Sequence, residues 1–235
     1  KLKVTPADMK TAVTLTGSPA TRVYNGKELH ANAATATDAN NNAYQFKIQY
    51  RVKGESEWLD SADAISRVDA GTTTVEVRAT DPAGNYANEA TAEEIITVDK
   101  RPLTITGEGY DAEQPYTGTE YKKTGYSWQE SDASDQSGLV DGESVQAEYL
   151  LVGTQVNTNP GYTGVFGNVS VSNGTKDVTE NYDIAQVPGT LIITASAIAQ
   201  YVTLTTQDVE YVYNGQPHTA ATATAVDKNG NEPKV

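Results

Sequence analysis

Histidines and carboxylates are the side chains of this sequence that could carry out acid–base chemistry. The two histidines, His30 and His218, each follow a Tyr-x-Gly motif and lie far apart in the chain. A catalytic triad needs a nucleophile and an orienting acid around one histidine, and the sequence has no Gly-x-Ser-x-Gly elbow. Adjacent acids such as Glu93 and Glu94 are typical of a solvated surface in an acidic chain. These residue types predict a protein without catalytic residues.

Oxygen-bearing side chains alternate in two loops and form the candidate metal ligands. They are Asp38, Asn40 and Asn42 in the first loop and Asp227, Asn229 and Asn231 in the second. Calcium prefers six to eight such oxygens, but both loops lack the glycine and the bidentate glutamate of an EF-hand. Asn and Asp also favour turns for backbone reasons. We therefore expect turns, with calcium as the alternative, and no other cofactor.

Three aromatic residues, Trp58, Tyr126 and Trp128, are the candidate ligand-binding side chains. An aromatic face complements the C–H face of a sugar ring, so they could form a stacking platform. A Trp at a strand end can equally cap the core of a β-sandwich. Packing in or around the core is the favoured interpretation, and sugar binding is the alternative.

Charge and cysteine content exclude several function classes. The net charge is −14, from 31 acidic and 17 basic residues, which repels phosphate backbones and anionic lipids. The absence of cysteine excludes disulfides, thiol catalysis and Cys-ligated zinc. No apolar run approaches the roughly 20 residues that span a bilayer. We expect no binding to nucleic acid and no membrane insertion. A Lys–Asn isopeptide crosslink stays open, with Lys122, Lys123 and Lys176 as ordinary surface candidates.

Apolar and polar residues alternate with a period of two, which is typical of strands with one buried face. The alternation is found in residues 46–52, 75–79, 145–151 and 169–171. Asn-, Gly- and Pro-rich turns separate these runs, and only residues 60–66 hint at a helical turn. The pattern predicts an all-β chain of tandem immunoglobulin-like antiparallel β-sandwich domains.

The sequence repeats internally, and two motifs mark each copy. The first motif is Val13-Thr14-Leu15-Thr16, Leu103-Thr104-Ile105-Thr106 and Val202-Thr203-Leu204-Thr205. The second is Tyr24-Asn25-Gly26, Tyr116-Thr117-Gly118 and Tyr213-Asn214-Gly215. The first and third copies resemble each other more than the second, at an offset of 189 residues from Val13 to Val202, although the string AATAT fits only after a slip of two residues. We infer an alternating A-B-A-B array.

The same offset defines the predicted boundaries. Residues 1–11 are the last strand and linker of a preceding repeat, residues 12–98 a first A-type repeat, residues 99–196 a B-type repeat and residues 197–235 the front of a second A-type repeat. The linker around Pro102 is short, which predicts limited movement between the two repeats that it joins. The incomplete last repeat is too small to bury a core alone, so we expect it to pair with another chain or a neighbouring domain.

The order of these motifs carries a family resemblance. The cassette K-R-P-L-T-I-T (residues 100–106), Tyr116-Thr117-Gly118, G-L-V-D-G-E-S (residues 138–144), Asn181-Tyr182 and G-T-L-I-I-T (residues 189–194) resembles the MBG/YDG-type repeats of bacterial cell-surface proteins. The resemblance covers most of residues 12–235. It implies an Ig-like stalk or adhesin repeat that is extracellular, on a bacterial cell surface or wall. The family has no agreed catalytic residues.

Together, these observations predict a non-catalytic structural or adhesive stalk segment that presents distal domains of a bacterial surface protein. Its partners would be neighbouring repeats of the same chain. The alternative is a binding module that takes host glycoproteins, host glycans or a polysaccharide on Tyr and Trp surfaces.

Overall fold

The computed structural model of the chain describes residues 1–39, 44–197, 202–227, 230 and 232. The fold is all-β, with several small sheets, as the period-two alternation predicts. Contacts between residues define two compact units. Unit 1 comprises Lys1–Thr106, Ser127–Ala147 and Asn168–Val187, and unit 2 comprises Gly107–Tyr126, Glu148–Gly167 and Pro188–Val235.

The strands and helices begin and end as follows. Up to residue 99 they are β1 (Ala7–Asp8), α1 (Met9–Ala12), β2 (Val13–Thr16), β3 (Ala20–Val23), β4 (Leu29–His30), β5 (Thr35–Asp38), β6 (Lys47–Val52), the 3₁₀ turn η1 (Ala62–Ala64), β7 (Ser66–Arg67), β8 (Gly71–Thr80), β9 (Tyr86–Ala87) and β10 (Ala90–Asp99). After residue 99 they are β11 (Arg101–Gly107), β12 (Gln114–Pro115), β13 (Tyr121–Lys123), β14 (Tyr126–Trp128), β15 (Ser144–Gly153), β16 (Asn157–Thr163), β17 (Val165–Ser172), η2 (Thr179–Asn181), β18 (Tyr182–Val187), β19 (Thr190–Thr194), β20 (Val202–Thr205) and β21 (Thr224–Asp227).

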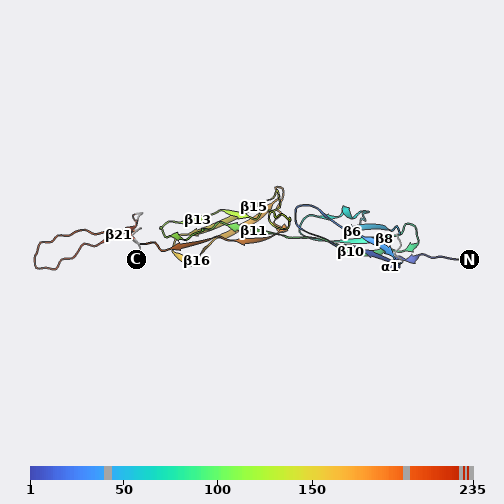
Figure 1. Cartoon of the computed structure of the whole chain (residues 1–235), viewed down its shortest axis with the longest axis horizontal. Coiled ribbons are helices and arrows are strands. Elements are labelled where there is room, and N and C mark those ends of the chain that lie inside the picture. The colour runs from blue at the N-terminus through green and yellow to red at the C-terminus, as the bar shows by residue number, and fades with distance from the viewer. Residues whose placement is uncertain (40–43, 198–201, 228–229, 231, 233–235) are drawn as a thin grey trace. The chain divides into compact units, whose positions relative to one another are not determined.

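A four-stranded sheet is the main element of unit 1. Its order is β3-β10-β8-β6, and the labelled strands β6, β8 and β10 lie side by side in Figure 1. β10 is antiparallel to β8 and parallel to β3. Along β8, Val75, Val77 and Ala79 are fully buried, whereas the residues between them are partly exposed. The alternation therefore points one face of this sheet into the core.

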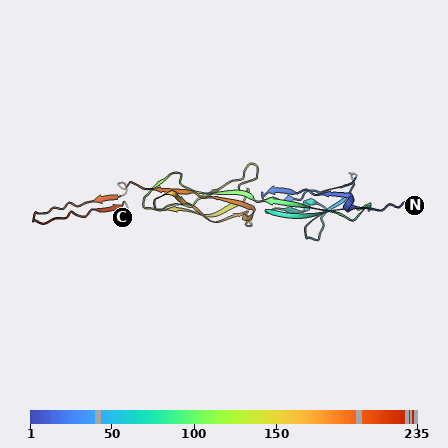
Figure 2. The same cartoon turned by 90° about the horizontal axis from the view of Figure 1, so that it is seen from below.

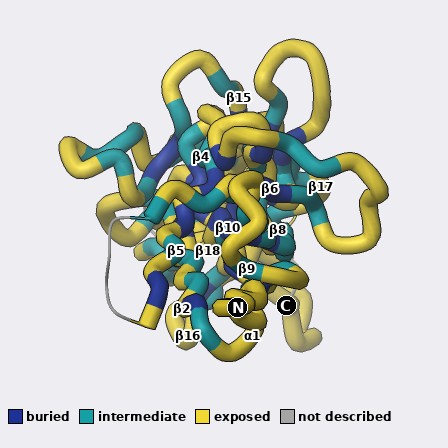
Figure 3. The backbone as a smooth tube through the Cα atoms, turned by 90° about the vertical axis from the view of Figure 1, so that its right-hand side faces the viewer, coloured by how far each residue is buried: buried dark blue, intermediate teal, exposed yellow. Residues whose placement is uncertain are grey.

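The buried face of that sheet packs against smaller strand pairs. β2 pairs with β5 and β4 pairs with β7, both antiparallel. Figure 2 shows the chain from below. Met9 on α1 is fully buried with Val13, Ala79 and Ala90. The sequence does not predict the short helix α1. Its four residues are too few to display a hydrophobic repeat of 3.6 residues. In Figure 3 the loops are largely exposed, whereas most buried positions lie on strands.

Residues of the two predicted whole repeats meet within unit 1. β10 ends at Asp99 and β11 begins at Arg101, so the short linker expected around Pro102 is reduced to Lys100. Pro102 lies inside β11, which pairs in parallel with β18. β11 has a buried residue at every second position, beginning with Arg101. A guanidinium therefore occupies the first core-facing position of this strand.

Unit 2 has a second core, built around a sheet in the order β12-β19-β16. Tyr149, Leu151, Leu191 and Ile193 are buried there. The surrounding rings are mostly tyrosines, namely Tyr110, Tyr116, Tyr121, Tyr126, Tyr162 and Phe166. Tyrosine suits such half-buried positions because its ring packs while its hydroxyl stays hydrogen-bonded.

The strand pair β20–β21 of unit 2 repeats the pairing of β2–β5 in unit 1. Val13 pairs with Asp38 and Thr16 with Thr35, while Val202 pairs with Asp227 and Thr205 with Thr224. The offset from Val13 to Val202 thus fits both strands without the two-residue slip that the string AATAT suggests. A string in which Ala and Thr alternate matches itself after a shift of two residues. Sequence comparison alone therefore cannot fix the register of this segment.

Candidate functional site

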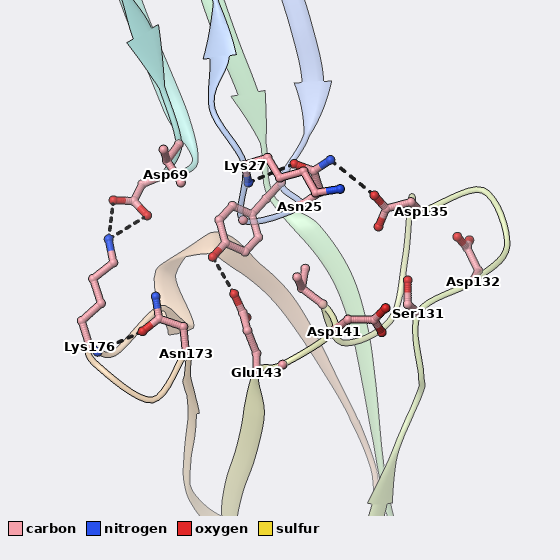
Figure 4. A pocket seen from close by; sticks show the side chains of 15 residues that line it. Asn25, Lys27, Asp69, Ser131, Asp132, Asp135, Asp141, Glu143, Asn173 and Lys176 are labelled. Carbon is pink, nitrogen blue, oxygen red and sulfur yellow. Dashed lines mark hydrogen bonds and ion pairs between the residues drawn. The ribbon is translucent and has the colours of Figure 1, made fainter.

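A polar hollow within unit 1 gathers residues from both predicted whole repeats. Its volume is about 540 Å³. Tyr24, Asn25 and Asp69 line it from residues 12–98, and Glu143 and Lys176 line it from residues 99–196. Figure 4 shows Asn25, Asp69, Glu143 and Lys176 around this hollow, on separate segments of the chain. We call this the junction site.

Arg101 is the most buried charged residue at the junction, with 0% of its surface exposed. Its five N–H groups make six hydrogen-bond contacts, because the two N–H groups of Nη1 have three acceptors. The acceptors are the carbonyl of Gly138 (2.6 Å), the carbonyl of Tyr24 (3.2 Å), the carbonyl and Oδ1 of Asp135 (2.8 Å each), Oγ of Ser131 (2.9 Å) and the carbonyl of Ser137 (2.8 Å). A planar guanidinium with five N–H groups suits such a ring of acceptors, and one of them, the Tyr24 carbonyl, belongs to the preceding predicted repeat.

Arg101 also holds a strained loop. Asp135 has a φ of 55°, a left-handed conformation that is uncommon outside glycine. Its carbonyl and its carboxylate both accept from Arg101, and its carboxylate also accepts from the side-chain amide of Asn25 (3.3 Å). The ion pair therefore fixes the loop and joins it to the Tyr-x-Gly turn.

Glu143 bridges two tyrosines. The hydroxyl of Tyr24 donates to its Oε1 (2.7 Å) and the hydroxyl of Tyr182 donates to its Oε2 (2.6 Å). The two rings meet edge to face with centroids 5.6 Å apart. Burial and then the Glu143 carboxylate raise the pKa of both tyrosines above the usual range, so both hydroxyls stay protonated donors. The three side chains form one closed hydrogen-bonded unit.

Asp69 makes a second link across the junction. Its Oδ1 accepts from the side-chain amide of Asn181 (3.0 Å), and Lys176 Nζ lies 3.0 Å from its Oδ2. The Asn181 hydrogen bond and then Lys176 hold the pKa of Asp69 below its usual value. Asn181 also accepts from the amide of Ala70 (2.7 Å). Lys176 is thus engaged with a carboxylate, and the isopeptide crosslink stays a prediction.

Asp132 organises the remaining wall of the hollow. Its carboxylate accepts from the amide of Gln136 (2.9 Å) and from the hydroxyls of Ser137 (2.8 Å) and Ser134 (3.1 Å). These donors, the Gln136 amide first, lower the pKa of Asp132 to about 2. Its charge stabilises the loop that presents Ser131 and Asp135 to Arg101.

The donors and acceptors of the junction side chains are largely paired with one another. Their chemistry therefore supports contact between parts of the chain. Among the described residues, no group of three or more His, Cys, Asp and Glu side chains is arranged to hold a metal ion. A further finding, limited to the same residues, is that no helix is long and apolar enough to cross a membrane. The donors and acceptors of the junction instead pair across the two predicted repeats.

The predicted calcium ligands are described only in part. Asp38 is buried and accepts from the hydroxyl of Tyr86 (3.2 Å). The carbonyl of Asp227 accepts from the amide of Gly230 (2.9 Å). The other four candidates, Asn40, Asn42, Asn229 and Asn231, lie outside the described residues.

The three aromatic candidates have different surroundings. Trp58 is half-buried, and the guanidinium carbons of Arg51 and Arg78 lie 4.4 and 4.3 Å from its ring centroid. Beside it is a hollow of about 310 Å³. Tyr126 and Trp128 are alternate residues of β14 and point to one side of that strand, and Tyr126 packs on the core of unit 2.

The two histidines lie in separate environments. Nδ1 of His30 is 2.8 Å from the carbonyl of Asp63, and its Nε2 is 3.4 Å from a carboxylate oxygen of Glu28. The ring of His218 stacks on Tyr211 with centroids 4.3 Å apart.

Glu94 is a carboxylate at a core position of β10. It is buried, and its Oε2 accepts from the amide of Ser18 (3.2 Å), while Oε1 has no hydrogen-bond partner among the described residues. Burial raises the pKa of Glu94, and the Ser18 amide opposes that effect only in part. The folded state therefore holds this proton more tightly than the unfolded chain does.

This burial predicts how Glu94→Gln changes stability with pH. The stability that a raised pKa contributes is present below the unfolded value and is lost as pH rises through the folded value. We expect Glu94→Gln to be more stable than the parent by about 1 kcal/mol at pH 7, with the difference shrinking towards pH 4. Urea unfolding at several pH values measures it. The control is Glu93→Gln, because Glu93 is exposed and pairs with Lys53 (2.7 Å). A gap between Glu94→Gln and the parent that is constant with pH contradicts this assignment.

The most connected residues of the junction were not among the side chains that the sequence marks for chemistry. Tyr24 belongs to a repeated Tyr-x-Gly motif, and Tyr182 and Arg101 belong to the motifs that carry the family resemblance. For Tyr24, the repetition of its motif was the signal that could have found it. A motif that returns in each repeat can mark a contact between repeats as well as a turn within one.

The fold and the junction define an all-β protein whose polar cluster joins parts of its own chain. No protein-family model matches the sequence, and no curated protein matches it.

Proposed function

We propose that the chain is a non-catalytic stalk or adhesive segment of a bacterial surface protein, built of tandem Ig-like β-sandwich repeats that present distal domains. The observation that carries this proposal is the junction site. A spacer holds a distal domain in place only if consecutive repeats keep a fixed orientation. Domains of one chain generally move relative to one another unless their interface restrains them.

The composition of the junction supports this role. Arg101, Glu143 and Asp69 each bond a residue of the other predicted repeat, and the buried guanidinium is satisfied by six acceptors. Such a network depends strongly on geometry, because each misplaced partner leaves a buried polar group without its hydrogen bond. Bending at this junction is therefore costly.

Distances between spin labels test the stalk function. The chain has no cysteine, so the exposed positions Glu57 and Asp183 can be replaced by cysteine and labelled specifically. We expect one narrow distance distribution in the parent and a broad one when Tyr24→Ala and Glu143→Ala are combined. The control is Glu180→Ala, which removes only an exposed pair with Lys100 (3.5 Å). A broad distribution in the parent contradicts the stalk proposal.

A glycan-binding module is the second candidate, and the hollow beside Trp58 favours it. Glu76, Glu89 and Arg51 line this hollow and could hydrogen-bond sugar hydroxyls next to the indole. A glycan array with the parent, Trp58→Ala and Trp128→Ala tests it. Binding that is lost in one Trp variant with an unchanged fold supports this candidate, whereas a pure spacer binds nothing.

A further inference from the structure

The backbone of Tyr24 is bonded to the end of β10 on both of its sides. The Tyr24 amide donates to the carbonyl of Asp99, the last residue of β10 (2.9 Å). The Tyr24 carbonyl accepts from the guanidinium of Arg101, two residues further along the chain (3.2 Å). The residue that follows β3 is therefore tied to the chain on either side of Lys100.

The tyrosine of the second Tyr-x-Gly motif is held in the same way, within unit 2. The Tyr116 amide donates to the carbonyl of Thr194, the last residue of β19 (2.8 Å). The Tyr116 carbonyl accepts from the hydroxyl of Ser196, which again lies two residues further along the chain. The two predicted whole repeats thus use one arrangement at the same place in their motifs.

Both tyrosines follow a strand whose partner is parallel. β3 pairs with β10 from Ala20 to Val23, and β12 pairs with β19 at Gln114 and Pro115. β10 and β19 are the last strands of their predicted repeats. In a parallel pair, the start of one strand and the end of the other lie at opposite ends of the ladder. The chain therefore reaches β3 at one end of its ladder and leaves β10 at the other.

This geometry decides how the β3–β10 pair responds to tension. A pull on the chain before β3 and after β10 draws the two strands along their length in opposite directions. Every hydrogen bond of the ladder is then stretched at once. Strands pulled apart from the same end separate one bond at a time, which needs a smaller force. β11, which follows β10 after Lys100 alone, is also parallel to its partner β18.

The β3–β10 ladder is also shielded from water. Ile96 and Val98 on β10 are fully buried, and Ala20 on β3 and the ring of Tyr24 are buried too. A hydrogen bond that breaks in such a place leaves a donor and an acceptor without water to replace their partner. Rupture of this ladder is therefore more costly than rupture of a solvated one.

We propose that β3 and β10 form a mechanical clamp, closed by Tyr24, that resists tension along the chain, and that β12, β19 and Tyr116 form the corresponding clamp of the next repeat. This inference deepens the proposed stalk function and rests on it, because only a segment under tension uses a clamp. The glycines of both motifs turn the chain away directly after the clamp, with φ of 73° at Gly26 and 76° at Gly118.

Single-molecule pulling of the full chain in two directions tests the clamp. The chain has no cysteine, so handles attach specifically to cysteines at exposed positions. Ser18→Cys with Lys100→Cys loads the β3–β10 ladder in shear, whereas Lys27→Cys with Lys100→Cys opens the same ladder from one end. Forced unfolding reports the unfolding barrier, so we expect the mean unfolding force of the first pair to be at least roughly twofold that of the second.

Proline variants with the first handle pair test the ladder itself. Amide directions alternate along a strand, so the amide of Arg22 faces β10, as that of Tyr24 does, and the amide of Val23 faces away. Arg22→Pro removes a ladder donor and should lower the shear force towards the value for opening from one end. Val23→Pro is the matched control, because β3 is an edge strand and this amide has no partner strand. Arg22→Ala controls for the lost side chain, and both controls should unfold near the force of the parent.

Equal unfolding forces for the two handle pairs overturn the clamp. That outcome leaves the stalk function standing, since the spin-label distances between Glu57 and Asp183 measure it separately, and a broad distance distribution overturns the stalk whatever the forces are. The clamp is also overturned if Val23→Pro lowers the shear force as much as Arg22→Pro does. The comparison of the two handle pairs changes no residue of β3 or β10, so it decides the matter even where a proline variant fails to fold.

Discussion

Replacing Arg101 with alanine is expected to lower the free energy of unfolding by about 3–5 kcal/mol. The side chain is fully buried, and its removal leaves the carbonyls of Ser137, Gly138 and Asp135 without the donor that satisfies them. Asp135 also loses the cation that holds its left-handed backbone. Urea unfolding of the parent and the variant measures the loss.

The neighbouring lysine supplies the matched control. Lys100 is exposed, and its contact with Glu180 spans 3.5 Å between largely solvated groups. Lys100→Ala should therefore change the free energy of unfolding by less than about 0.5 kcal/mol. Arg101→Lys should recover only a small part of the loss, because one ammonium does not reproduce the planar fork of donors. Equal stabilities of Arg101→Ala and Lys100→Ala would refute the role given to the guanidinium.

The strands of this protein were predictable because their signal is local. Period-two alternation marks β6, β8 and β15 within single stretches of sequence, and burial follows it in β8 and β15. In β6 the neighbours Gln49 and Tyr50 are both buried, although the alternation predicts that Gln49 faces solvent. The weak helical hint in residues 60–66 corresponds to the 3₁₀ turn at Ala62–Ala64. By contrast, α1 is too short to show a helical period, and only its packing through Met9 explains it.

The junction was not predictable in the same way because its contacts are not local. Tyr24 meets Glu143, and Asp69 meets Asn181, across more than a hundred residues of chain. An arginine at the start of a strand normally indicates a solvated end. Arg101 is buried because loop carbonyls from residues 135–138 surround it. The sequence of the 100–106 cassette does not predict these contacts.

The loop that Arg101 binds leads to the second large effect, at Gly138. Its φ is 81°, a region that favours glycine. A Cβ built there lies within 2.5 Å of the carbonyl carbon of Glu130 and closer still to its oxygen. That neighbour is backbone, paired through a bridge between Glu130 and Leu139, so it has no rotamer to move aside. Gly138→Ala should therefore lower the free energy of unfolding by about 3–5 kcal/mol.

Gly142 separates the two causes of that loss. Its φ is 85°, close to that of Gly138, but a Cβ built there meets no atom within 4 Å. Gly142→Ala therefore has the backbone strain without the collision, and should lose only about 1 kcal/mol. Urea unfolding of both variants gives the cost of the collision as their difference. Gly138 also donates its amide to Pro102 and accepts from Arg101, so a displaced Gly138 weakens the junction network as well. If Gly138→Ala loses no more than Gly142→Ala, the loop yields easily and does not constrain Arg101.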